Sequence, residues 1–252
     1  PFAKTTLYPE GVRTPWIVVW PGVAEPGYID TEHMISAIDL MPTILDILDL
    51  PIPDYLDGRS IVPLVEGGTQ EGRDRVFVEF NEGPSAEPRP MRAVYTRDYV
   101  YIFNPWATGE HEVIAEWLWY RSYAAMRNLA RRDPAVAERF RFANERTVEE
   151  LYNYSVDPNA LNNLVDNPSY QSIAEGLRGE LLEWMRETDD YVLPAFENRN
   201  DTQILRAFMA HEDRLALERA QVIEWKRWRN RAQETGNNTG YYDPSTVSRF
   251  EP

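Results

Sequence analysis

The segment Trp16–Trp20 constrains the fold of this chain more than any other stretch. Its sequence, WIVVW, consists of apolar residues, mostly β-branched or aromatic, between Pro15 and Pro21. A strand with one face in water would alternate apolar and polar residues, so this run predicts a strand that is covered on both faces. Ahead of it, Pro9, Gly11 and Pro15 disfavour a helix and favour a tight turn. We therefore expect a turn that leads into a buried strand.

Lys4, at the start of this turn, is unusual in a chain that otherwise uses arginine. Only Lys4 and Lys226 are lysines among the 26 Lys and Arg residues. A lysine ammonium is a compact charge with three rotatable donors, which suits a single anionic oxygen. The alternative is a solvated loop charge, the general position of lysine in proteins.

Four motifs occur in one order along the chain. K-T-T-x-Y-x-x-G-x-R-x-P begins at Lys4 and leads into the apolar run. S-A-I-D-L-M-P-T-I-L begins at Ser36, D-G-R-S with P-L begins at Asp57, and L-Y-N with D-P and N-L begins at Leu151. Together they resemble the C-terminal half of formylglycine-dependent sulfatases of the arylsulfatase and sulfamidase type, in the alkaline phosphatase superfamily. The chain opening and the M-R-A-V stretch from Met91 resemble the sulfamidase-related branch.

The resemblance implies a nucleophile that this sequence does not contain. The family's formylglycine is made from Cys or Ser in a C/S-x-P-x-R motif, and the chain has no cysteine and no S-x-P-x-R. The family's metal-binding aspartates and their histidine precede the lysine segment. We therefore expect the C-terminal half of a sulfatase, cut just before Lys4. Its Ca²⁺ ligands would lie in the absent N-terminal half, with no metal bound by this chain.

The expected fold class is α/β. Residues 1–72 would be the end of a large mixed-sheet α/β sulfatase domain, because the Pro- and Gly-rich stretch before residue 73 favours a domain boundary. Residues 73–200 would form a smaller α+β domain with an antiparallel sheet, and residues 201–252 a helical extension with a loose tail. Strands are predicted at 76–80, 91–96 and 99–103, with a hairpin turn at Arg97-Asp98, and again at 151–152. The stretch 81–90 is expected to be irregular.

Helices are expected where apolar residues recur at helical spacing or where Gly and Pro are missing. The first is interrupted by Pro42, which predicts a kink or a new helix near that residue. The expected ranges are 34–48, 110–133, 134–144, 169–188 and 201–235.

The net charge of −15 excludes several classes of partner. Nucleic acids and anionic membranes need a basic face, and sulfated polymers are also repelled at long range. Any sulfate site must therefore be a local positive pocket. No apolar run approaches the 18 residues of a membrane span. The sequence leaves the compartment open, whereas the resemblance implies a periplasmic, extracellular or lysosomal protein.

The three histidines, Arg92 and Asp39 are further candidates for functional residues. His33, His111 and His211 lack metal-ligand spacing. The resemblance would place His111 near the active-site mouth, so His111 and Arg92 are candidates for substrate contact. Asp39 is more typical of a helix cap or a solvated charge than of a ligand.

Two acidic pairs and one aromatic cluster are also candidates for functional sites. The adjacent pairs 149–150 and 189–190 should point apart or into solvent. The aromatic cluster in residues 117–123 is more typical of core packing, although it would also suit a wall that faces carbohydrate.

The leading hypothesis is a sulfatase part that is inactive without its N-terminal half and acts on sulfate esters or sulfamates, on a small molecule or a glycan. The resemblance gives Lys4 contact with a sulfate oxygen. One alternative is a phosphonate or phosphodiester hydrolase of the same superfamily. The other is a non-catalytic interaction module.

Overall fold

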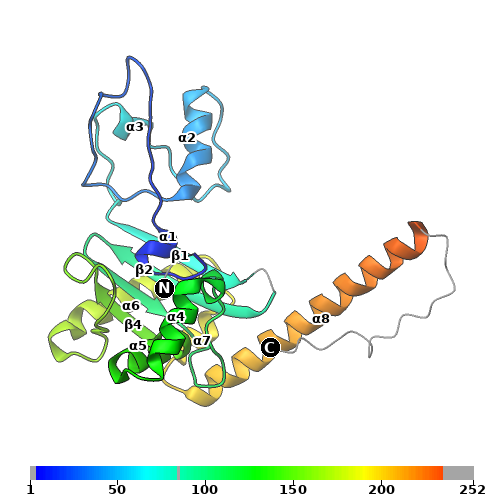
Figure 1. The fold of residues 1–252 in the computed structure, drawn as a ribbon. Coiled ribbons are helices and arrows are strands. Elements are labelled where there is room, and N and C mark those ends of the chain that lie inside the picture. The colour runs from blue at the N-terminus through cyan, green and yellow to red at the C-terminus, as the bar shows by residue number, and fades with distance from the viewer. Residues whose placement is uncertain (1–3, 84–85, 235–252) are drawn as a thin grey trace.

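The computed structural model describes residues 4–83 and 86–234, which form two lobes and a long helix (Figure 1). The smaller lobe, at the top of Figure 1, carries α2 (Leu40–Ile47) and α3 (Val62–Val65). The larger lobe contains the sheet, and α8 (Thr202–Glu234) leads away from it. Whether the lobes are independent domains with a boundary at residue 72 stays a prediction.

The larger lobe is built on a four-stranded antiparallel sheet in chain order. Its strands are β1 (Arg75–Glu82), β2 (Pro88–Thr96), β3 (Tyr99–Phe103) and β4 (Glu149–Asn153). Arg97 and Asp98 join β2 to β3, with Tyr95 opposite Val100, so the predicted strands and hairpin are confirmed. The expectation of irregular structure over 81–90 was wrong at both ends, because β1 and β2 extend into that stretch.

Alternation along the central strands creates a separate apolar core on each face of the sheet. Ala93, Tyr95 and Ile102 belong to one core, with Trp106 and Trp117. The intervening side chains belong to the second core, which includes α6 (Gln171–Glu187) and α7 (Leu193–Glu197). The buried members of this second core from the central strands are Val94, Tyr101 and Phe103.

The remaining helices of this lobe match the predictions with one exception. Residues 110–115 are not helical; η2 (Glu116–Trp119), a 3-10 turn, precedes α4 (Arg121–Ala130), which packs on α5 (Pro134–Glu145). The prediction of one helix over 110–133 was therefore wrong in its first half. The η3 turn (Pro168–Tyr170) and α6 confirm the predicted helix near 169–188.

The long predicted C-terminal helix is α8, which covers the expected range among the described residues. Leu205 and Met209, near its start, are fully buried in the cores of the larger lobe. No helix of the described chain is long and apolar enough to cross a membrane. The predicted loose tail after residue 235 lies outside the described residues.

The expected buried strand at residues 16–20 is absent, and this prediction was wrong for the structure. Residues 13–20 have no regular secondary structure, and Ile17 and Val19 are 83% and 84% exposed. All strands of the described residues belong to the sheet of the larger lobe, so this segment has no neighbouring strand with which to pair. An apolar run indicates a capacity to be buried, but burial requires a second surface.

The smaller lobe leaves much of its apolar surface exposed. Its helical part is η1 (Ala37–Asp39) followed by α2, which confirms a break near Pro42. Pro42 lies in the first turn of α2, where the missing amide hydrogen costs no bond. The apolar face of α2 lines an open hollow of about 420 Å³ with Tyr55. The exposed apolar side chains around this hollow are Ile38 of η1 and Leu40, Met41 and Ile44 of α2.

Candidate functional site

Lys4 is exposed and stands at the start of a segment that quickly becomes buried. Thr5 has a positive φ of 69°, and its hydroxyl donates to the backbone oxygen of Lys4 at 2.5 Å. Thr6, Leu7 and Tyr8 are buried. The predicted turn is a single helical turn, α1 (Pro9–Val12), with proline in its first turn, where its fixed φ suits a helix. Lys4 is thus exposed, whereas residues 6–9 that follow it are buried.

Three contacts hold this segment on the larger lobe. The Tyr8 hydroxyl donates to Glu150 Oε2 at 2.5 Å, and the Tyr95 hydroxyl donates to the Leu7 carbonyl oxygen at 2.6 Å. The Arg146 guanidinium lies 4.1 Å from the centre of the Tyr8 ring, within cation–π range. These contacts fix residues 7 and 8 from three different elements, so they also restrict where Lys4 can lie.

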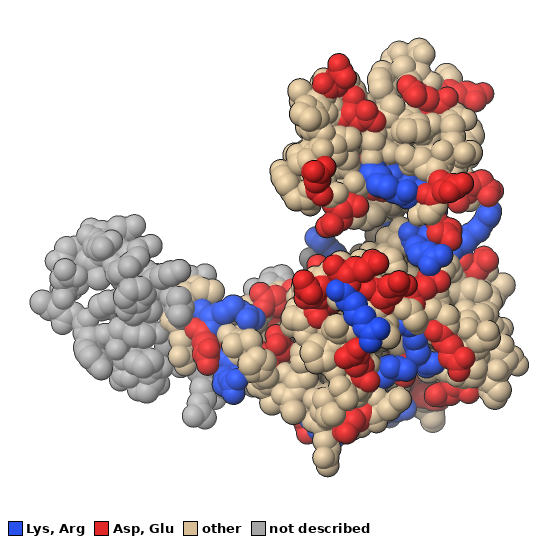
Figure 2. All heavy atoms as spheres, turned by 180° about the vertical axis from the view of Figure 1, so that it is seen from behind, with Lys and Arg blue, Asp and Glu red and all other residues tan. Residues whose placement is uncertain are grey.

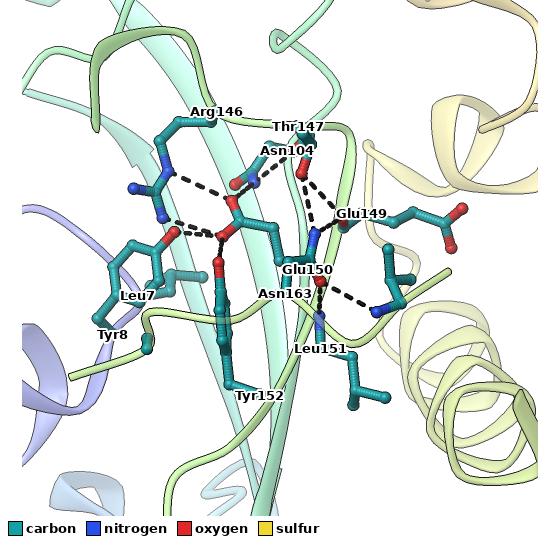
Figure 3. A network of polar contacts seen from close by, with 12 residues as sticks. Leu7, Tyr8, Asn104, Arg146, Thr147, Glu149, Glu150, Leu151, Tyr152 and Asn163 are labelled. Atoms are coloured by element: carbon teal, nitrogen blue, oxygen red, sulfur yellow. Dashed lines mark hydrogen bonds and ion pairs between the residues drawn. The ribbon is translucent and has the colours of Figure 1, made fainter. Parts of the chain in front are cut away.

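Glu150 is the centre of the network that holds Tyr8 (Figure 3). Its carboxylate, which is 0% exposed, accepts from Tyr8 and Tyr152 at 2.5 Å and from Asn104 at 2.7 Å. Arg146 completes the set with bonds of 3.0 and 3.3 Å to the two carboxylate oxygens. Every neighbour is a donor, which suits a group that only accepts. Burial, and then the charge of Glu150, raise the pKa of the Tyr152 hydroxyl well above its ordinary value.

Glu149 points to the opposite face of β4 and serves the other core. It accepts from the Tyr101 hydroxyl at 2.6 Å and from Arg178 Nε at 2.6 Å, with Arg199 at 3.4 Å. The prediction that Glu149 and Glu150 point apart is therefore confirmed. The other alternative, that they point into solvent, does not apply, because each carboxylate is surrounded by donors.

Arg92, a predicted substrate contact, is buried and bonded within the chain. Its guanidinium forms a bidentate pair with Asp190, at 2.5 and 2.8 Å, and donates to Asn81 Oδ1 at 2.8 Å. Such a pair fixes β2 against the loop before α7. The expectation that Asp190 would point into solvent was wrong for the same reason. The contacts favour a structural role for Arg92, and its contact with substrate stays a prediction.

His111 also lies at a junction inside the chain. Its Nε2 is 2.8 Å from Asp213 Oδ2 of α8, and nearby Arg206 pairs with Glu110 at 3.1 Å. These pairs attach α8 to the loop that follows β3. Whether His111 also contacts substrate stays a prediction.

The other histidines have local partners. His33 Nδ1 is 2.9 Å from Asp30, and His211 Nδ1 is 2.6 Å from Arg214. No group of His, Asp or Glu in the part of the chain that the structure describes could hold a metal ion. The donor set for Ca²⁺ that the resemblance implies is thus not offered by the described residues.

The motifs at Ser36 and Asp57 meet in space as a scaffold for the smaller lobe. Asp39 caps the η1 turn with Ser36, accepts from the Arg59 amide at 2.8 Å and pairs with Arg73 at 2.5 Å. Asp39 takes part in a capping box as the third residue of η1, whose N-cap is Ser36, whereas at the N-cap position of α2 its side chain makes no capping bond. The carboxylate is buried and not solvated. A Cβ on Gly58 would stand 2.1 Å from a backbone oxygen in η1, so only glycine allows this approach.

The motif at Leu151 also has a structural explanation. The Asn163 side chain accepts from the Leu151 amide at 2.9 Å, and Asp157 accepts from the Leu161 amide at 2.8 Å. These bonds close the turn after β4 and hold the strand in the sheet.

The surface around these sites is largely acidic. Figure 2 shows red side chains over both lobes, with blue side chains interspersed among them, in keeping with the net charge of −15. An anion would therefore bind only where a cation is locally presented. The described end of the Lys4 segment offers one such cation.

Residues that position Lys4 were not singled out from the sequence, although a signal was present. Tyr8 belongs to the motif that begins at Lys4, and Glu150 and Tyr152 flank Leu151 in the fourth motif. The structure brings these two motifs together over 142 residues of sequence. Arg146 had no such signal.

This chain is similar in sequence to known sulfatases. The family model for N-sulphoglucosamine sulphohydrolase, C-terminal, matches residues 1–115. An ulvan-active sulfatase of Formosa agariphila is 31% identical over 193 residues, which are 74% of this chain and 36% of that protein. The human N-sulphoglucosamine sulphohydrolase is 27% identical over 212 residues, 75% of this chain and 40% of that protein. The chain thus spans less than half the length of these relatives.

The fold is also found in a crystal structure of a sulfatase-type protein from Bacteroides thetaiotaomicron. The two superpose with a TM-score of 0.53 and 20% identity, over 75% of this chain and 32% of the other. At this identity the match shows a common fold and nothing more specific.

Proposed function

Because this chain is related to sulfatases and corresponds to their C-terminal part, we propose that it forms the C-terminal portion of an enzyme that hydrolyses sulfate esters or sulfamates. The observation that carries this proposal is the anchored segment that presents Lys4. A solvated loop lysine would not need the buried Tyr8–Glu150 bond four residues away, or the bond from Tyr95 to Leu7 three residues away.

In this proposal Lys4 donates to an oxygen of the sulfate group. As the bond to the leaving oxygen breaks, negative charge builds up on the departing group and the sulfate oxygens, and the ammonium stabilises it through a charge-assisted hydrogen bond. The network around Glu150 keeps the segment in place before substrate binds, so no ordering is needed at the reacting moment. The donor then acts more on the transition state than on ground-state binding.

The remaining chemistry must come from residues that the structure does not describe. No described group could hold Ca²⁺, and the sequence has no cysteine for a formylglycine precursor. We propose that the nucleophile and a divalent cation, Ca²⁺ by resemblance, belong to a preceding part of the protein. That part would also cover the exposed apolar surface formed by residues 16–20 and α2.

We further propose that the substrate is a sulfated carbohydrate, since the relatives include an ulvan-active sulfatase and an N-sulphoglucosamine sulphohydrolase. The resemblance also favours a compartment outside the cytoplasm.

Substitution of Lys4 in the complete protein tests this role. Lys4→Ala should lower kcat by about 10²–10³, or roughly 3–4 kcal/mol, without lowering Tm. Lys4→Arg should recover only part of the rate, because a planar guanidinium cannot occupy the same point as an ammonium. Lys226→Ala, in α8, is the matched control and should leave kcat unchanged. A normal kcat/KM for Lys4→Ala together with a lowered Tm would make Lys4 a structural residue.

The same assays separate the alternatives. Turnover of phosphonate or phosphodiester substrates, with none of sulfated ones, would favour a different hydrolase of the superfamily. The absence of any turnover by the complete protein, together with the lack of C/S-x-P-x-R and paired aspartates in its preceding residues, would favour a non-catalytic module.

A further inference from the structure

The aromatic cluster that follows the loop after β3 divides into an inward and an outward pair. Trp117 is buried and Tyr123 is partly buried, and both belong to the core of the larger lobe. Trp119 is 88% exposed, and Tyr120 beside it is half-exposed. The core packing expected for the cluster is therefore confirmed for one pair only. Such an exposed indole contributes little apolar burial to the fold, and together with Tyr120 it leaves two adjacent aromatic side chains accessible at the surface.

The outward pair stands on a rigid base. The rings of Trp117 and Tyr123 meet edge to face at 5.2 Å, and the Tyr123 ring lies 5.2 Å from that of Phe140 on α5. The Tyr123 hydroxyl donates to Asn144 Oδ1 at 2.8 Å, while the Val113 amide donates to the Asn144 carbonyl oxygen at 2.8 Å. Because its neighbours on both sides are fixed in this way, Trp119 is presented by a segment that needs little ordering on binding.

The same base adjoins the segment that presents Lys4. Thr6 and Leu7 line a small cavity of about 10 Å³ together with Trp106 and Trp117. Followed from Arg13 toward the N-terminus, the segment that presents Lys4 begins over the Tyr154 ring and reaches this cavity at Leu7 and Thr6. Met91 and Asn104 also line this cavity, at the end of β2 and β3 away from their hairpin. Lys4 is two residues before Thr6 and Trp119 is two residues after Trp117, so each is within about 7 Å of extended chain from a residue that lines the cavity.

We propose that Trp119, with Tyr120, forms a sugar-binding subsite that holds a sulfated glycan beside Lys4; this rests on the proposed function. The flat indole suits the C–H face of a pyranose ring, and aromatic side chains bring large contact area at low entropy cost. Arg121, the next residue, is exposed and supplies a cation for a second sulfate in an otherwise acidic chain. A small aryl sulfate would reach Lys4 without this subsite, whereas an oligosaccharide would use both.

The test compares two substrates in the complete protein, a sulfated oligosaccharide and a small aryl sulfate. Trp119→Ala should raise KM for the oligosaccharide by about three- to tenfold, while kcat/KM for the aryl sulfate stays unchanged. Trp119→Phe should keep most of the affinity because it retains an aromatic face. The control is Val156→Ala, an exposed apolar truncation in the turn after β4, beside the β2–β3 hairpin at the other end of the sheet.

A second measurement does not depend on turnover. Calorimetric titration of the complete protein carrying Lys4→Ala with the same oligosaccharide should show binding that weakens when Trp119→Ala is added. Unchanged KM and unchanged binding in Trp119→Ala would overturn the subsite, even if Lys4→Ala abolishes turnover and so supports the proposed function. A lower Tm in Trp119→Ala with unchanged KM would also overturn it, since Trp119 would then be covered by another part of the protein. Binding that depends on Trp119 in a protein without sulfatase activity would support the subsite and refute the proposed function.

Discussion

Replacing Glu150 with glutamine should destabilise this chain strongly, although the side chain hardly changes in volume. Glu150 accepts five hydrogen bonds from Tyr8, Tyr152, Asn104 and Arg146, and none of these partners faces it as an acceptor. Glutamine presents one oxygen and one NH₂ group, so its NH₂ group must face partners that are themselves hydrogen-bond donors. The tyrosine hydroxyls can rotate to accept, but the Arg146 guanidinium cannot.

The magnitude follows from the burial of the pair. The side chains of Arg146 and Glu150 are 3% and 0% exposed, so the variant leaves a guanidinium charge buried without its counter-charge. Breaking a buried ion pair on one side costs about 3–5 kcal/mol. Since a domain of this size is stable by roughly 5–15 kcal/mol, the loss is a large fraction of the total. Tyr152→Phe, which removes one hydrogen bond to the carboxylate, should cost only about 1.5–3 kcal/mol.

Urea unfolding of the 252-residue chain, followed by tryptophan fluorescence, measures this loss from the shift in the midpoint at constant slope. The matched control is Glu145→Gln, since Glu145 also pairs with an arginine, Arg141, four residues away at 3.1 Å. That pair is 63% and 47% exposed, and should be worth about 0–1 kcal/mol. Equal losses for Glu150→Gln and Glu145→Gln would refute the reasoning, because the carboxylate would then be solvated. In the complete protein Glu150→Gln should also lower kcat, because Tyr8 loses its anchor.

Three other outcomes are expected. Gly58→Ala should lower the free energy of unfolding in urea by about 1–3 kcal/mol, because its Cβ would stand 2.1 Å from the Ile38 carbonyl oxygen. Gly179→Ala, in open space on α6, should instead stabilise the chain by about 0.5–1 kcal/mol. Equal effects of the two substitutions would contradict the close approach at Gly58. Burial raises the pKa of the Tyr152 hydroxyl, so the contribution of this residue to stability is complete below about pH 10 and falls by about 1.4 kcal/mol per pH unit above it. In alkaline titrations followed by circular dichroism, Tyr152→Phe should make that loss of stability less steep. Ile17→Lys should change the unfolding free energy of this chain by less than about 0.5 kcal/mol, but it should clearly lower the Tm of the complete protein. A neutral effect in both would mean that no other part of the protein covers residues 16–20.

The elements of the larger lobe could be predicted because their signals are local. The β-rich runs around Arg97-Asp98 gave the central hairpin, and the apolar stripe through Leu177 and Leu181 gave α6. Both patterns follow from side-chain direction in strands and helices, which does not depend on distant residues. The helix expected over 110–133 was half wrong, because residues 111–115 are not helical and the extended backbone of Tyr120 separates η2 from α4.

The candidate site shows the same limit more sharply. Lys4 could be chosen from the sequence because it is rare and begins a motif, and Asp39 could be placed at a helix start because that signal is local, although Ser36 is the N-cap of η1. The roles of Arg92 and Asp190 could not be derived, since their pairing joins residues 98 positions apart. No sequence pattern around Arg92 indicates that its partner is Asp190, and none around Asp190 indicates Arg92.

The sequence by itself determined most of the strands and helices of the larger lobe, which segment carries the lysine, and that the net charge leaves only a local site for an anion. Only the tertiary structure decided what those segments contact. It placed the motif of Tyr8 against that of Glu150, turned Trp119 outward while Trp117 became core, and left residues 16–20 exposed although their pattern predicted burial. The physical reason is that helices and tight hairpins depend on bonds between near neighbours, whereas the pairing of distant strands, burial and ion pairing depend on a second surface that is distant in the chain or outside it.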